Sequence, residues 1–456
     1  MVYLTTEPIN CIKKTLKMRF VKFVLLASLV LSCSGNATEY KSKVQEPEFL
    51  HRTLKQITDV IVHDIFSPTV ASRIYAYSTV AAYEAVIHQD SSYVSLAGQL
   101  NGLTEVPKPK AGLEYCFPIA SMQAMFKVGR TMVFSEDKMD AYYDQLMKEI
   151  VETQIPDEVL DRSIEYGNVV ADHILAWSSK DNYKQSRSFP KYSISNEPGT
   201  WKPTPPAYMD AIEPHWNKIR PFAIDSAAQF APPPPTPFST AKDSKFYNEA
   251  FAVYDVGKNQ TAEQREIAFF WDCNPFMMNV KGHVMFATKK ISPGGHWINI
   301  TATACRNSKA NVVKSAEAYA RVAIVLADGF ISCWDEKYRS VLIRPETYIN
   351  QYIDENWVPT LQTPPFPEYT SGHSVISAAA ADALTGVFGE SFAFTDSTEI
   401  EFGLAPRSFT SFKHAADEAA ISRFYGGIHY MPACEIGKQE GSALAAFIRK
   451  KLITEK

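Results

Sequence analysis

A stretch of small residues behind a Ser-Gly-His sequence constrains the fold more than any other feature of this chain. The stretch covers residues 374–384 and is rich in alanine, and Ser371, Gly372 and His373 precede it. A helix that is apolar or small on all sides is a buried one, so we expect a central helix here. The start of that helix offers unpaired backbone N–H groups and the positive end of the helix dipole, which together favour a bound oxyanion.

Helical periodicity recurs along the chain, and the sequence shows no sustained strand alternation. Apolar residues at three-to-four spacing begin at Phe49 and predict a helix. Ser67 and Pro68 provide a cap and a first-turn proline, which predict a second helix to about residue 88. Further helices are predicted over residues 117–133, 136–152, 156–177, 262–271, 277–290 and 311–338. The pattern therefore predicts an all-α fold.

A proline-rich segment divides the predicted helices into two halves. Residues 181–240 hold 12 of the 28 prolines, whereas residues 49–180 and 241–456 carry the helical patterns. Large aromatic residues such as Trp201 and Trp216 give the segment apolar anchors. We therefore expect an ordered segment that wraps the helices, with a linker between two domains as the alternative.

Two other short stretches supply charged and nucleophilic side chains. Lys337 is followed after six residues by Arg344, and Arg423 is followed after five residues by His429. Arginine forks match the geometry of an oxyanion, and lysine adds a compact positive charge. A histidine directed at the centre of the bound group can act as a nucleophile or as a ligand of a metal oxyanion.

The three stretches together resemble two protein families that share one anion pocket. Lys-x6-Arg-Pro, Thr-Ser-Gly-His and Ser-Arg-x5-His are similar to the signatures of the vanadium-dependent haloperoxidases and the type 2 phosphatidic-acid phosphatases. The match covers residues 334–430, with looser similarity back to about residue 50. Trp334 and Phe366 resemble the haloperoxidase branch in particular. The resemblance implies an all-α helical bundle of the vanadium haloperoxidase and acid phosphatase type.

The resemblance also implies a role for each site residue. In a haloperoxidase, His429 would be the axial ligand of vanadate, His373 the acid–base group, and Lys337 the group that polarises bound peroxide. Trp334 and Phe366 would line the pocket. The residues that would bind vanadate, or phosphate in a phosphatase, are Lys337, Arg344, Ser371, Gly372, Arg423 and His429.

Two activities are compatible with these residues. A haloperoxidase would oxidise halide with hydrogen peroxide to hypohalous acid, whereas a phosphatase would hydrolyse a phosphate ester through a phosphohistidine at His429. The long helical half before the site and the absence of an internal apolar run of about twenty residues favour the haloperoxidase. Phe366 stands where bromoperoxidases tend to have a histidine, which favours chloride. The sequence leaves the halide, the organic acceptor and the oligomeric state open.

Other site types fit the sequence less well. The Gly-x-Ser-x-Gly elbow of a serine hydrolase is absent around Ser371. Histidines and carboxylates do not cluster at metal-ligand spacing near His373 and His429. A helical protein that binds an anion without turnover stays open, because Ala433 stands where both families usually carry the aspartate that orients the axial histidine. Glu435 is a candidate substitute for that aspartate.

The sequence also suggests a role for four further residues near these stretches. Thr370 replaces the proline that usually precedes Ser-Gly-His, and Asp272 is a candidate partner for Arg423. His283 and His296 lie in partly apolar surroundings, where core or supporting positions are commoner than positions in a pocket.

The N-terminus predicts export. Several lysines and Arg19 precede an apolar run from Phe23 to Leu31, which is too short to span a bilayer and is typical of a signal peptide. The run ends in a sequence that resembles a bacterial lipobox, with Cys33 as the lipidated residue. We expect a signal peptide over residues 1–33, a polar tether over 34–48, and a lipoprotein of the cell envelope that contacts the membrane only through this anchor.

Charge and cysteine content exclude other classes. The net charge of −4 gives no reason to expect nucleic-acid binding. Apart from Cys11 and Cys33, five scattered cysteines remain and no Cys-x-x-Cys pair occurs. This pattern predicts neither a zinc site nor a disulfide framework, so we expect buried thiols.

Overall fold

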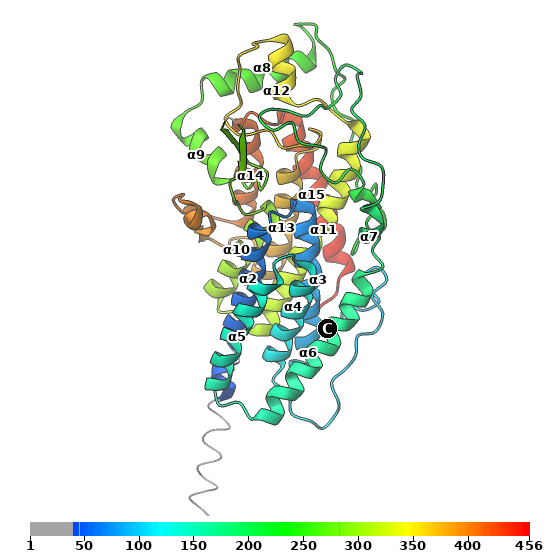
Figure 1. The fold of residues 1–456 in the computed structure, drawn as a ribbon, viewed down its shortest axis with the longest axis vertical. Coiled ribbons are helices and arrows are strands. Elements are labelled where there is room, and N and C mark those ends of the chain that lie inside the picture. The colour runs from blue at the N-terminus through cyan, green and yellow to red at the C-terminus, as the bar shows by residue number, and fades with distance from the viewer. Residues whose placement is uncertain (1–39, 45, 282) are drawn as a thin grey trace, which may run out of the picture.

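The computed structural model describes residues 40–44, 46–281 and 283–456. These residues form an elongated helical bundle with two small hairpins (Figure 1), which confirms the predicted all-α class. In this part of the chain, no helix is both long and apolar enough to cross a bilayer. The predicted signal peptide and Cys33 lie outside the described residues.

Most of the predicted helices are present within a few residues of their expected bounds. Ser67 caps the second of them by accepting a hydrogen bond from the Val70 N–H. The longer helices are α2 (Glu48–His63), α3 (Pro68–Val86), α4 (Phe117–Met132), α5 (Glu136–Glu152), α6 (Asp157–Ser178), α8 (Lys245–Lys258), α9 (Ala262–Phe270), α10 (Pro293–Ser308), α11 (Val312–Ser340), α12 (Pro345–Tyr352), α13 (Gly372–Phe388), α14 (Phe412–Tyr425) and α15 (Met431–Lys451).

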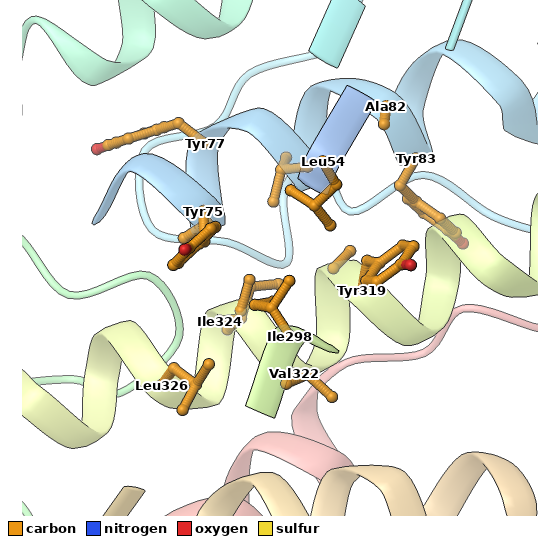
Figure 2. Packing of buried hydrophobic residues seen from close by; sticks show 14 of the residues in the cluster. Leu54, Tyr75, Tyr77, Ala82, Tyr83, Ile298, Tyr319, Val322, Ile324 and Leu326 are labelled. Carbon is orange, nitrogen blue, oxygen red and sulfur yellow. The ribbon is translucent and has the colours of Figure 1, made fainter. Parts of the chain in front are cut away.

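Helices α3 and α11 bring the two halves of the chain into one core. Every residue of α3 is buried, including the charged residues Arg73 and Glu84. Figure 2 shows Tyr83 of α3 beside Tyr319 of α11, and Tyr75 of α3 directed toward the part of α11 that carries Ile324. The N-terminal and C-terminal helices therefore stabilise each other across a shared apolar interface.

Helix α13 is the buried helix that the small-residue stretch predicts. It packs against α11, α14 and α15. The approach of α15 is close because two of its residues, Gly437 and Gly441, lack side chains. A Cβ atom at Gly441 would lie 2.0 Å from the Val375 backbone oxygen of α13, and one at Gly437 would lie 3.0 Å from the Ser371 backbone oxygen. Helix packing thus holds the start of α13 in a fixed place.

The predicted helix over residues 277–290 is wrong. Here β1 (Met278–Lys281) and β2 (Val284–Ala287) form an antiparallel hairpin in which Met278 pairs with Ala287. In the sequence, a lysine, a glycine and a histidine interrupt the apolar residues of this segment, which suits a hairpin better than a helix. His283 lies exposed in the turn, so the expectation of a core or supporting position for it is also wrong. A second hairpin joins β3 (Phe394–Asp396) and β4 (Arg407–Phe409).

The proline-rich segment is ordered and attached to the bundle. Trp201, Trp216 and Phe222 are buried. The buried Asp328 carboxylate of α11 accepts hydrogen bonds from the backbone N–H groups of Phe222, Ala223 and Ile224, at 2.6, 2.7 and 2.9 Å. The α11 carboxylate therefore fixes the backbone of residues 222–224.

Part of the predicted polar tether over residues 34–48 is folded against the helices. Residues 40–44 are helical, and Tyr40 and Val44 are buried in the main core. The Tyr40 hydroxyl donates a hydrogen bond to Glu114 at 3.1 Å. The prediction of a tether rested on the polar composition of residues 34–48 as a whole. It overlooked the apolar side chains of Tyr40 and Val44, which are buried in the core.

Candidate active site

Helix ends and the loops between helices bring the predicted anion-binding residues together. Lys337 lies in the last turn of α11, Arg344 precedes α12, and Ser371 caps α13. Arg423 lies in the last turn of α14, and His429 follows it in the loop before α15. Five segments thus meet at one end of α13.

Arg344 and His429 are in direct contact. Both side chains are buried, and Arg344 Nη1 lies 3.1 Å from His429 Nε2. Arg344 also donates to the Phe366 and Ile428 backbone oxygens, each at 2.8 Å. Its Nη2 is buried without a hydrogen-bond partner. The guanidinium is therefore fixed in position and keeps one donor group available.

A carboxylate that sequence reasoning missed orients His429. Glu368 Oε1 lies 2.8 Å from His429 Nδ1 and also accepts the Tyr430 backbone N–H at 3.0 Å. Burial raises the pKa of Glu368 to about 7. The expectation that Glu435 replaces the missing aspartate is wrong, because Glu435 is exposed on α15. The sequence feature that could have identified Glu368 is its position directly before the Tyr-Thr-Ser-Gly-His sequence.

Lys337 binds backbone carbonyls in this structure. Its Nζ donates to the oxygens of Pro367, Glu368 and Thr370, at 3.0, 3.0 and 2.5 Å. Complete burial lowers the pKa of Lys337 to about 8, with the positive Arg344 nearby contributing in the same direction. The lysine thus fixes the Ser-Gly-His loop and places a positive charge beside it.

The start of α13 has the form that the sequence predicts. Ser371 Oγ accepts hydrogen bonds from the Ser374 backbone and hydroxyl, at 3.4 and 2.9 Å. The N–H groups of Gly372 and His373 lie in the first helical turn, where no intrahelical carbonyl is available to them. They are therefore suited to donate to an anion.

Thr370 can replace the usual proline at this buried position because its hydroxyl has a hydrogen-bond acceptor. The hydroxyl donates to Glu440 Oε2 at 2.8 Å, and the Ser332 hydroxyl donates to Glu440 Oε1 at 2.8 Å. All three side chains are buried. Glu440, on α15, is a second supporting residue that the sequence analysis did not single out.

Arg423 and His373 meet on the loop that follows α9. Arg423 Nη1 donates to the Trp271 backbone oxygen at 2.7 Å, and the backbone of the same residue faces the His373 ring. Asp272 Oδ1 lies 3.9 Å from Arg423 Nη2, so the predicted pairing of these residues is present. Part of the His373 ring is accessible, but its Nε2 and the Arg423 Nε are buried without partners.

The pocket is strongly positive. Burial lowers the pKa of Arg344 to about 10 and also lowers that of Arg423. Burial and the neighbouring arginines hold the pKa values of His373 and His429 well below the ordinary range. Burial is the main cause of each shift, and neighbouring cations add to it for Arg344, His373 and His429. A bound oxyanion would offset this repulsion.

The two aromatic residues predicted to line the pocket lie over its cations. The Phe366 ring centroid is 5.2 Å from Lys337 Nζ and 5.1 Å from the Arg344 guanidinium carbon. The Trp334 ring is 5.7 Å from Lys337 Nζ and 4.9 Å from the Phe366 ring, measured to the centroid. Both side chains therefore provide an apolar and cation-binding wall.

This donor set fits vanadate. Arg344 Nη2, Arg423 Nε and His373 Nε2 are buried polar atoms without partners in the described residues. Such atoms are costly unless a ligand satisfies them. His429 Nε2 accepts from Arg344, so the ring is oriented with a lone pair toward this group of donors. A tetrahedral anion with a metal centre can accept hydrogen bonds from the donors through its oxygens and can bind the His429 lone pair through its metal.

Comparison with known proteins agrees with this geometry. A solved structure titled as the first bacterial vanadium-dependent iodoperoxidase is 50% identical, with a TM-score of 0.85 over 90% of this chain and 97% of that one. The chain belongs to the vanadium-dependent haloperoxidases. The family model described as the VCPO second helical-bundle domain matches residues 317–454 of this haloperoxidase. No curated protein sequence matches it.

More distant structures share the fold of this haloperoxidase. Holo and apo forms of a bacterial vanadium-dependent chloroperoxidase are 15% and 16% identical to it, each with a TM-score of 0.64. These matches cover 85% and 84% of this chain and 93% and 94% of the other chains. Vanadate is therefore the cofactor of this enzyme type, and the buried donors described above are the groups available to hold it.

Proposed function

We propose that this enzyme oxidises iodide with hydrogen peroxide, using vanadate bound to His429. The unpartnered buried atoms of Arg344, Arg423 and His373 carry the proposal, because they form a ready site for an oxyanion. The 50% identity to a protein titled a vanadium-dependent iodoperoxidase supports iodide as the halide. The apolar rings of Trp334 and Phe366 favour iodide further, since iodide loses its hydration shell at lower cost than chloride.

The hydrogen bonds of His429 place its two ring nitrogens in different roles. Glu368 accepts at Nδ1, so Nδ1 carries the proton, and Nε2 keeps the lone pair that contacts Arg344. A neutral imidazole with this tautomer is suited to bind the vanadium of vanadate. Vanadate, when bound, supplies a Lewis-acidic centre at which hydrogen peroxide is activated.

The remaining residues stabilise charge and move protons. Arg344 and Arg423 would neutralise charge on the oxyanion through their unpartnered nitrogens, and the Gly372 N–H at the start of α13 would donate a hydrogen bond to it. His373 is the proton-transfer group, because its Nε2 is free of other partners. Lys337 would add positive charge beside the loop that holds the oxyanion.

A paired assay tests the proposal. The chain without residues 1–33 is incubated with vanadate, hydrogen peroxide and iodide, bromide or chloride, and a dye traps the oxidised halogen. We expect iodide oxidation that requires vanadate and is lost in His429→Ala. Preference for chloride would contradict iodide as the main substrate and would agree with the weaker indication from Phe366 in the sequence.

A second arm of the assay tests the phosphatase alternative. The same protein, free of vanadate, is given a phosphate monoester. Phosphate release that vanadate inhibits, without any halide oxidation, would overturn the haloperoxidase proposal. Silence in both arms would instead indicate a site that binds an anion without turnover, the alternative raised by Ala433.

We also propose that the enzyme is an exported lipoprotein of the cell envelope. The basic residues, the apolar run from Phe23 to Leu31, and Cys33 support this proposal. Fractionation of bacteria that express the full chain provides the test. We expect the protein in the membrane fraction, and release of Cys33→Ser from that fraction; equal membrane retention of the variant would contradict lipid anchoring.

A further inference from the structure

A compact cluster of buried ligand-type side chains lies beside the anion pocket but takes no part in it. Cys273 Sγ, His296 Nδ1 and Glu399 Oε1 lie within 4.8 Å of one another, and all three residues are buried. His296 Nδ1 is 3.3 Å from Cys273 Sγ and 3.0 Å from Glu399 Oε1, and Cys273 Sγ is 3.7 Å from the same carboxylate oxygen. Ligand atoms around one tetrahedral ion have similar separations, because zinc lies about 2.0–2.3 Å from each.

A fourth residue fixes the orientation of the histidine. Asp396 Oδ2 lies 2.6 Å from His296 Nε2. A carboxylate at this position holds the proton on Nε2 and leaves the Nδ1 lone pair available to a metal, the arrangement found behind most metal-binding histidines. The Asp396 carboxylate is itself held by the Thr398 backbone N–H at 3.0 Å.

The cluster joins segments that are far apart in the sequence. Cys273 follows α9, His296 lies on α10, Asp396 ends β3, and Glu399 lies in the short helix after it. Without a metal, His296 can donate to both carboxylates only if it carries a proton on each ring nitrogen. That arrangement satisfies the imidazole but leaves the buried thiol with only weak hydrogen bonds.

We propose that Cys273, His296 and Glu399 bind a zinc ion, with Asp396 as the carboxylate partner of His296. Thiolate, imidazole and carboxylate are each zinc ligands, and three protein ligands leave one coordination position open to a water molecule. Binding releases the thiol proton and the Nδ1 proton to solvent, so no oxidant or reductant is needed. This site is separate from the vanadate site and does not depend on the proposed halide chemistry.

The proposed ion would stabilise the loop that supports the anion pocket. Trp271, two residues before Cys273, stacks on the His296 ring with a centroid distance of 4.6 Å. Its backbone oxygen accepts the Arg423 hydrogen bond described above. Zinc would therefore fix Arg423 indirectly, by holding residues 271–273 against α10.

Metal analysis of the vanadate-free protein provides the test. Purified full-length protein is incubated with zinc sulfate, desalted, and analysed by inductively coupled plasma mass spectrometry. We expect about one zinc ion per chain. Cys273→Ala and Glu399→Gln should lose most of this zinc. Cys305→Ala is the matched control, because it removes another buried free thiol, on α10, and should retain the zinc.

A spectroscopic measurement keeps the test decisive if the Cys273 variant fails to fold. Cobalt(II) added to the metal-free wild-type protein should give a thiolate-to-metal charge-transfer band and the visible bands of a tetrahedral site. Absence of zinc from the wild type together with absence of the cobalt bands would overturn the proposal and leave a hydrogen-bonded network. Zinc retained in full by both folded ligand variants would overturn it equally.

Discussion

One oxygen of Glu368 accepts hydrogen bonds from both the His429 ring and the Tyr430 backbone, at 2.8 and 3.0 Å. The carboxylate thus fixes the ring of His429 and the chain direction that follows it. Gly427, two residues earlier, has a φ of +78° and provides the turn that this arrangement needs. The missing aspartate at Ala433 is therefore replaced from a different loop.

Glu368→Gln should weaken vanadate binding by about 10- to 100-fold, the usual effect of removing a carboxylate that orients a ligating histidine. A glutamine amide can donate to His429 Nδ1 and so favours the wrong tautomer. Vanadate affinity follows from titrating iodide oxidation against vanadate concentration. Glu435→Gln is the control and should bind vanadate like the wild type, because Glu435 is exposed. Equal affinity of both variants would contradict the role of Glu368.

The pKa of about 8 for Lys337 predicts a pH dependence of anion binding. Below this pH the lysine is protonated and attracts the anion, and above it the positive charge is lost. Vanadate affinity of the wild type should therefore fall as the pH rises through about 8. Lys337→Met should bind more weakly and lack this step. Because vanadate ionises in a similar pH range, the comparison of the two proteins isolates the contribution of the lysine.

The buried Glu440 predicts a pH dependence of stability. Burial raises its pKa from 4.5 to about 7, so its contribution is fully present below pH 4.5 and is lost as the pH rises through about 7. Glu440→Gln should remove this loss, which amounts to at most ~3 kcal/mol. Urea unfolding of the vanadate-free protein at pH 5 and pH 8 measures it. A pH effect of the same size in both proteins would contradict the prediction.

Asp328→Ala should destabilise the protein by at least ~3 kcal/mol, because it leaves three buried N–H groups without an acceptor. Urea unfolding measures the change. Asp335→Ala provides the control on the same helix. It removes the 2.8 Å hydrogen bond from Asn217, which belongs to the same proline-rich segment, at a less buried position. Its cost should be no more than ~1 kcal/mol. Similar costs for both variants would contradict the anchoring role of Asp328.

The helices were predictable because their signals are local. The Ser67 cap and the first-turn Pro68, for example, act within one helical turn, and both are present at the start of α3. The hairpin over residues 278–287 was missed because short apolar runs fit a helix or a strand equally well. Only the pairing of the two strands distinguishes them.

The donors of the anion pocket could be identified because they occur in three short stretches of fixed spacing. Their supporting carboxylates could not, because Glu368 and Glu440 act across 61 and 70 residues of sequence. The cluster around His296 was missed for the same reason: its contact with Asp396 spans 100 residues. Sequence spacing therefore identifies the residues that would bind the anion. It does not identify the carboxylates that orient and support those residues.

The interface between α3 and α11 makes the region that holds the anion donors dependent on the N-terminal helices. The anion donors all lie within residues 337–429, inside the region that the family model matches. A fragment of residues 317–454 would nevertheless expose the face of α11 that packs against α3, including Val322 (Figure 2). Exposed apolar surface of this kind drives aggregation. The catalytic region is thus not a transplantable unit, and engineering of the pocket must keep the N-terminal helices.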